Sequence, residues 1–331
     1  MKRIVAVLTL CAMLFALCFP AAEAQQVGKV PRIGFLDNST ASGSAGLAEA
    51  FRQELSKLGW IEGKNITIEY RFSEGKSERL PKLAVELVRL KVDLIVVAST
   101  VSALAAKSAT TTIPIVMTNA GDPVAAGLVA TLARPGGNVT GFSSLAPELN
   151  TKRLEILKDA VPKLARVGLL WGVVGARIQQ EIQLKELRPA AVALKLELEE
   201  IETQFDPKGL ESAFQTAKQK QVNAIMTTAT PRFLPERKRI VELAGKYRLP
   251  AIYAQKEFVD AGGLMFYGAD LADSYRRVAT YVDKILKGAQ PADLPVQQAT
   301  KFEFIINLKA AKQIGLTIPP EVLARANKVI K

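Results

Sequence analysis

Polar and aromatic side chains recur where apolar, strand-like segments end. In the first half of the chain, they are Asn38, Ser39, Thr40, Ser99, Thr100, Asn119, Asp122, Ser143 and Ser144. In the second half, they are Trp171, Thr228, Thr230, Tyr253, Glu257 and Asp270. This set is rich in hydroxyl and amide groups and poor in charge. It is therefore suited to hydrogen-bonded recognition of a small neutral or carboxylate-bearing molecule.

The spacing of these residues also suggests how such a molecule would lie. Ser99, Thr100 and the loop from Asn119 to Asp122 precede helical patterns, and helix N-termini favour anions. We therefore expect a head group, such as a carboxylate, to bind there. An aromatic or apolar body would then contact the second half near Trp171 and Tyr253.

Several of these residues have an alternative, purely structural interpretation. Ser99 and Thr100 could serve only to cap the helix that follows them, and capping is the favoured role for Asp122. Trp171 could stack on a ligand or fill a core, and Tyr253, at the end of a strand, is favoured as a core residue.

The composition argues against catalysis. The sequence contains no histidine, and both of its cysteines, Cys11 and Cys18, lie in the N-terminal apolar segment. This excludes a Ser-His-Asp arrangement and nearly all zinc sites, and it leaves no thiol nucleophile after that segment. The first strand leads into Asp37–Thr40 and not into the glycine-rich turn of a dinucleotide-binding reductase. We expect no enzymatic activity, no metal and no cofactor.

The N-terminal residues have the pattern of an export signal. Lys2-Arg3 precedes an uncharged, mostly apolar run over 4–19, and Ala22-Glu23-Ala24 matches a cleavage site. We expect residues 1–24 to be a signal peptide cleaved after Ala24, which would place the mature protein in the periplasm. A lipid anchor on Cys18 is the alternative, and the bulky residue before that cysteine disfavours it.

Length and charge narrow the class further. The 331 residues suffice for two domains, and 49% of them are hydrophobic. The net charge of +12 is spread along amphipathic patterns and does not form a block. A solvated basic surface is therefore favoured, and we expect no nucleic-acid partner.

Strand and helix patterns alternate in both halves, which predicts parallel sheets covered by helices on both faces. Strands are expected over 32–36, 66–70, 92–97, 113–117 and 138–141, and again over 166–170, 196–199, 222–228, 249–253 and 262–268. Helices are expected over 45–58, 78–90, 101–109, 123–134 and 272–287, and from Asp206-Pro207 onward.

Together these segments predict an α/β fold of two Rossmann-like lobes with parallel sheets, joined by a multi-strand hinge. The N-terminal lobe is expected over 30–142, completed by about 272–298. The C-terminal lobe is expected over 145–268, completed by parts of 302–331. About three crossings between the lobes would allow hinge closure.

Short motifs along the mature chain point to one family. They lie at 58–65 (LGWIEGKN), 121–124 (GDPV), 127–129 (GLV), 133–141 (ARPGGNVTG) and 262–264 with 267–270 (GGL, YGAD). In combination they resemble the substrate-binding proteins of bacterial ABC importers of the tryptophan/tyrosine type. The resemblance implies a type I periplasmic-binding-protein fold, a ligand held between the lobes and delivery to a membrane permease; we expect a monomer.

One loop departs from the pattern of the amino-acid-binding members. Those proteins tend to carry an acidic residue after the third strand of the second lobe, where Thr230 stands here. Glu257 is then the best charged candidate for an amine, although it could also be a solvated surface residue. A periplasmic sensor that signals through a membrane receptor is the alternative function that the sequence leaves open.

Overall fold

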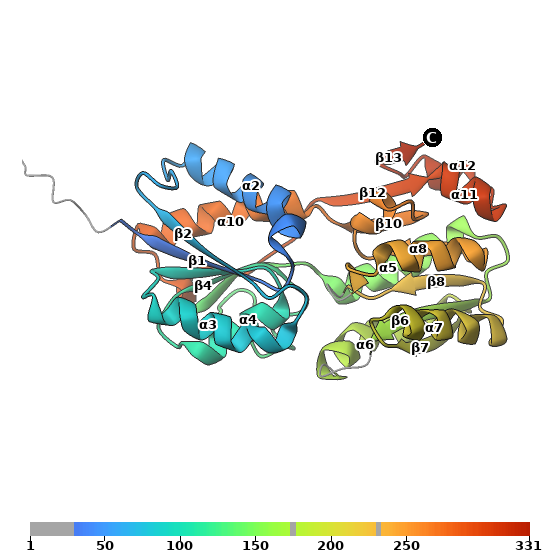
Figure 1. The fold of residues 1–331 in the computed structure, drawn as a ribbon, viewed down its shortest axis with the longest axis horizontal. Coiled ribbons are helices and arrows are strands. Elements are labelled where there is room, and N and C mark those ends of the chain that lie inside the picture. Colours follow the sequence, from blue (N-terminus) through green and yellow to red (C-terminus); the bar gives the residue numbers. More distant parts are fainter. Residues whose placement is uncertain (1–29, 173–176, 230–232) are drawn as a thin grey trace, which may run out of the picture. The chain divides into compact units, whose positions relative to one another are not determined.

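The computed structural model describes residues 30–172, 177–229 and 233–331 (Figure 1). Its first sheet contains β1 (Arg32–Asp37), β2 (Thr67–Phe72), β3 (Leu94–Val97), β4 (Ile115–Ala120), β5 (Val139–Ser143) and β11 (Gln297–Gln298). These strands lie in the order β11-β5-β4-β3-β1-β2 and pair in parallel. The order reverses between β1 and β3, as in doubly wound α/β folds.

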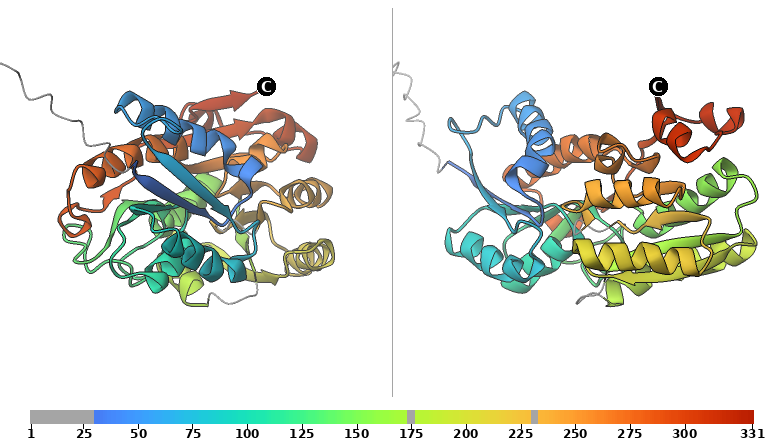
Figure 2. Two further views of the ribbon diagram at one scale, coloured as in Figure 1. Left: turned by 60° about the vertical axis from the view of Figure 1, so that its left-hand side comes forward. Right: turned by 45° about the vertical axis from the view of Figure 1, so that its right-hand side comes forward.

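Helices cover both faces of this sheet because its buried strands are apolar on both sides. Helices α2 (Ala41–Lys57) and α10 (Leu271–Leu286) lie side by side over one face (Figure 2). Helices α3 (Leu80–Arg89) and α4 (Thr100–Ala109) pack on the other. The alternation is visible along β1, where Ile33 and Phe35 pack with α2 and α10 and Leu36 packs with α3.

The second sheet repeats this plan with one departure. It contains β6 (Arg166–Gly172), β7 (Glu197–Thr203), β8 (Ala224–Thr227), β9 (Ala251–Tyr253), β10 (Met265–Ala269), β12 (Phe302–Asn307) and β13 (Lys328–Ile330). The strand order is β13-β12-β10-β9-β8-β6-β7. All pairs are parallel except β10 with β12, which is antiparallel. The predicted α/β fold with two parallel-dominated sheets is confirmed.

The second sheet also has helices on both faces. One face carries α5 (Ala146–Ala160) and α6 (Arg177–Ala193), joined at the end of the chain by α11 (Leu308–Ile314) and α12 (Pro320–Leu323). The other face carries α7 (Pro207–Gln219) and α8 (Arg237–Lys246), and a short helix, α9 (Glu257–Asp260), precedes β10. The carboxylate of Asp206 caps α7 as predicted, accepting a hydrogen bond of 2.8 Å from the Gly209 N–H.

The chain passes between the two sheets after β5, between β10 and α10, and between β11 and β12. Residues Pro31–Lys331 form one compact unit. Its division into two lobes at the predicted boundaries remains our interpretation. None of the helices in the described part of the chain has the length and apolar character needed to cross a membrane.

The prediction of a helix over 123–134 is wrong. Its first turn begins as expected, because the Asp122 carboxylate accepts hydrogen bonds of 3.1 and 3.0 Å from the two N–H groups that a cap should satisfy. The turn then ends at Gly127, whose φ of +68° leaves the helical region. The ammonium group of Lys107 donates hydrogen bonds to the carbonyl oxygens of Gly127 and Leu128. These oxygens therefore do not accept helical hydrogen bonds, and the segment continues as turns.

Candidate ligand-binding site

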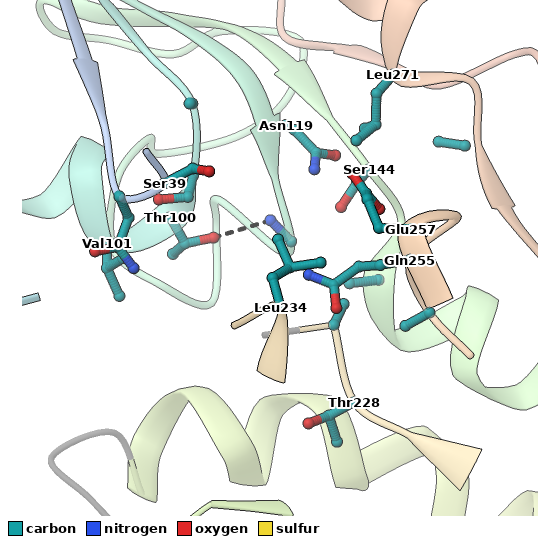
Figure 3. A pocket seen from close by; sticks show the side chains of 18 of the residues that line it. Ser39, Thr100, Val101, Asn119, Ser144, Thr228, Leu234, Gln255, Glu257 and Leu271 are labelled. Atoms are coloured by element: carbon teal, nitrogen blue, oxygen red, sulfur yellow. Dashed lines mark hydrogen bonds between the residues drawn. The ribbon is translucent and has the colours of Figure 1, made fainter. Parts of the chain in front are cut away.

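A cavity of about 820 Å³ lies where strands of both sheets reach their carboxyl ends (Figure 3). Parallel strands end at the same edge of a sheet, so the loops that follow them collect there. From the first sheet, the loops after β1, β3, β4 and β5 contribute lining residues. From the second, they come from the end of β6 and from the segments after β8, β9 and β10.

Most of the ligand-binding residues predicted from the sequence line this cavity. It is lined by Asn38, Ser39, Ser99, Thr100, Asn119, Asp122, Ser144, Trp171, Thr228, Glu257 and Asp270. Thr40, Ser143 and Tyr253 are not among its lining residues. Thr230 lies outside the described residues.

The three residues that do not reach the cavity have structural roles. Thr40 caps α2, accepting a hydrogen bond of 3.0 Å from the backbone three residues on. The buried Ser143 hydroxyl donates to the Gly121 carbonyl at 3.0 Å. The Tyr253 ring is buried and stacks on Phe258 with 4.6 Å between ring centroids, which confirms its interpretation as a core residue.

Several lining residues also form hydrogen bonds that cap helices or fix loops. Ser99 caps α4, accepting from the Ser102 N–H at 3.3 Å, and Asp270 caps α10. The hydroxyl of Thr100 accepts a hydrogen bond of 3.0 Å from the Gly121 N–H, which ties the loop after β4 to the start of α4 (Figure 3). These bonds fix the positions of the loops and so preform the wall of the cavity.

Asn38 is tied into the same wall. Its buried side chain accepts a hydrogen bond of 2.5 Å from the Ser73 hydroxyl and donates to Ser77 at 3.3 Å. Both polar atoms of its side chain therefore have partners in the segment that follows β2.

Two buried polar atoms in the cavity wall have no hydrogen-bond partner among the described residues. They are Oδ1 of Asn119, at the end of β4, and Nε1 of Trp171, at the end of β6. Buried polar groups in native proteins are nearly always satisfied, so such atoms need an explanation. A ligand that donates to Asn119 and accepts from Trp171 would satisfy both.

Asp37 also lines the cavity, at the start of the loop that the sequence places at the ligand site. It ends β1 with only 5% of its surface exposed. Its Oδ1 accepts from the Ser39 N–H at 2.8 Å, and its Oδ2 accepts from the Ser44 hydroxyl. Burial raises the pKa of this carboxyl, and the hydrogen bonds lower it by less. The signal was present in the sequence as an acid directly after a buried strand.

Arg153 is a cavity residue that the sequence did not predict. It lies on α5, lines the cavity and is 2% exposed. Its Nε donates to the Tyr267 carbonyl and its Nη1 to Oδ1 of Asn150, each at 2.7 Å. Burial lowers the pKa of the guanidinium to about 9. No helix was predicted where α5 lies, so the sequence offered no reason to place this residue at the site.

Comparison with known proteins identifies the family. Residues 40–330 match the model of a family described as ABC transporter substrate binding protein. A tyrosine-binding protein of Clostridioides difficile (strain R20291) is 28% identical over 275 residues, which cover 81% of this chain and 76% of that protein.

Solved structures agree with this match. A conserved domain protein of Vibrio cholerae has a TM-score of 0.84 at 28% identity, with 91% of this chain and 100% of that chain covered. An ABC domain from Streptococcus pneumonia, solved in complex with L-Trp, has a TM-score of 0.82 at 27% identity, with 91% and 99% covered. Proteins of this family bind solutes and are not enzymes. This chain belongs to the ABC transporter substrate-binding protein family and has the type I periplasmic-binding-protein fold.

Proposed function

We propose that this protein is the extracytoplasmic solute-binding component of an ABC importer. In this role it captures one small organic ligand, aromatic or carboxylate-bearing, between its two lobes and delivers it to a membrane permease. The observation that carries the proposal is the cavity, whose wall comes from both sheets and holds two unpartnered buried polar atoms, Oδ1 of Asn119 and Nε1 of Trp171. The family description is one of transport, and it gives the sensor alternative no support.

The relatives favour an aromatic ligand. One is described as binding tyrosine, and another was solved with L-Trp. The cavity suits such a molecule, because apolar side chains line it beside the polar ones, among them Phe205, Leu234 and Leu271. With Tyr253 in the core, the aromatic body would lie against Trp171 and these apolar residues, and a polar group would reach Asn119.

Ligand capture would be coupled to hinge closure. A ligand in contact with both lobes shifts the population only if it binds the closed arrangement more tightly than the open one. Wall residues such as Thr100, at the start of α4 beyond the first sheet, and Thr228, directly after β8 of the second, offer contacts from both sides. We further propose that the mature protein starts at Gln25, acts in the periplasm and is a monomer.

A thermal-shift screen of amino acids, aromatic acids and sugars tests this function. At a ligand concentration of about one hundred times Kd, a ligand that binds only the folded state stabilises it by about 2.7 kcal/mol, enough to shift the melting temperature clearly. We expect hits among aromatic amino acids or aromatic carboxylates. A sugar or a metal cation as the sole hit would contradict the proposal.

A further inference from the structure

The cavity wall carries more acidic than basic side chains, and its two basic side chains differ in whether an acid neutralises them. Acidic residues at Asp37, Glu78, Asp122, Glu257, Asp270 and Glu303 line it, together with the basic residues Arg153 and Lys256. The Lys256 ammonium lies 3.1 Å from a carboxylate oxygen of Asp260 and is compensated by it. Arg153 has no carboxylate within ion-pair distance in the part of the chain that the structure describes.

Arg153 is nevertheless more deeply buried than any other cation of the wall, with 2% of its surface exposed. A buried charge is costly unless an opposite charge compensates it. Its two hydrogen-bond acceptors, the Tyr267 carbonyl and Oδ1 of Asn150, are both neutral. Burial lowers the pKa of the guanidinium only to about 9, so the group stays charged at neutral pH.

The same two bonds hold the guanidinium in one orientation. They engage Nε and Nη1, and an arginine presents further N–H donors on Nη1 and Nη2. A planar guanidinium fixed in this way is suited to a carboxylate, which it can bind through two parallel hydrogen bonds.

We propose that Arg153 is the counter-ion of a ligand carboxylate, and that this carboxylate is required for binding. The proposal deepens the function proposed above and rests on it. The acids elsewhere in the wall would repel an anion, so the carboxylate is favoured beside Arg153. The full positive charge of Arg153 attracts a carboxylate more strongly than the partial charge of the α4 N-terminus, which is where the sequence alone places the head group. The Asn119 acceptor and the acidic residues then face the donor groups of the ligand.

A set of matched small molecules tests the requirement on the unaltered protein. L-tryptophan carries both charged groups, indole-3-propanoate lacks the amine, and tryptamine lacks the carboxylate. Succinate and benzoate add carboxylates without the indole ring. We expect L-tryptophan or indole-3-propanoate to bind about 10- to 100-fold more tightly than tryptamine, the range for a hydrogen bond between charged groups.

Variants of the arginine test the assignment to this residue. Arg153→Gln removes the charge and keeps a donor, and it should weaken the binding of a carboxylate probe by about 10- to 100-fold. Arg153→Lys keeps the charge and should lose less. Arg188→Gln is the matched control, because Arg188 is exposed, paired with Glu181 and Glu200, and absent from the wall. It should leave the Kd unchanged.

The outcomes separate this proposal from the proposed function. If tryptamine binds as tightly as L-tryptophan, or Arg153→Gln binds the carboxylates as the wild type does, the role of Arg153 is wrong and the proposed function stands. If only succinate binds, and Arg153→Gln abolishes it, the aromatic ligand class is wrong and the role of Arg153 stands. If no probe binds, both fail. Should Arg153→Gln not fold, the comparison of tryptamine with L-tryptophan decides.

Discussion

Replacing Asp37 with asparagine tests the electrostatics of the cavity in the ligand-free protein. Burial raises the pKa of this carboxyl in the folded state, whereas in the unfolded chain it is about 3.9. As the pH rises from the unfolded value through the folded one, the carboxyl must ionise inside the protein, and the free energy of unfolding falls. The fall amounts to about 1.4 kcal/mol for each unit by which the two pKa values differ.

Asp37→Asn removes the free-energy cost of ionising a buried carboxyl and keeps the size and shape of the side chain. The amide oxygen can still accept from the Ser39 N–H, and the amide NH₂ can donate to the Ser44 hydroxyl. Urea unfolding of both proteins between pH 4 and pH 8 measures the difference. We expect the variant to be at least as stable as the wild type at pH 7 and to gain on it as the pH rises.

Ser44→Ala provides the opposite perturbation. It deletes a hydrogen bond that lowers the pKa of Asp37, so the total fall in stability with rising pH should be larger, and extend to higher pH, than in the wild type. If Asp37→Asn is instead clearly less stable than the wild type at pH 7, with the same pH dependence, then the carboxylate makes a stabilising contact, and the reasoning is refuted.

Three further predictions concern the fold, the site and the N-terminus. Gly141→Ala should lower the unfolding free energy by about 2–6 kcal/mol in urea titrations, because φ is +123° and a Cβ would lie 2.2 Å from the Met117 carbonyl oxygen. The control Gly137→Ala, with open space around its Cβ, should change it little. Trp171→Phe should weaken ligand binding by about 2- to 10-fold in calorimetry without lowering the melting temperature of the ligand-free protein, since it deletes a buried N–H that has no described partner; an unchanged Kd would argue against a bond to the ligand. The intact mass of the exported protein should correspond to a chain starting at Gln25, and a lipid-modified chain starting at Cys18 would contradict this.

Much of the fold was predictable because its signals are local. Apolar runs such as Ile33–Leu36 specify buried strands, and the Asp206-Pro207 cap specifies the start of α7. The prediction of a helix over 123–134 failed where hydrogen bonds from Lys107 to the carbonyls of Gly127 and Leu128 replaced helical hydrogen bonds. No local sequence pattern predicts such a tertiary contact.

The site was predictable to the extent that it follows from the strand ends. Residues such as Ser99, Asn119 and Trp171 reach the cavity because the topology brings their strand ends together. Tyr253 does not, because its ring turns into the core against Phe258. Arg153 was missed because it lies on a helix, and its burial depends on elements far apart in the sequence.

The central claim is that one small ligand binds in the cavity between the two sheets. A crystal structure of the mature protein with the best ligand from the thermal-shift screen tests it most directly. We expect one molecule per chain, with a polar group within hydrogen-bond distance of Asn119 Oδ1 and an aromatic or apolar body beside Trp171. A ligand bound outside the cavity, or one that touches residues of a single sheet only, would contradict the account.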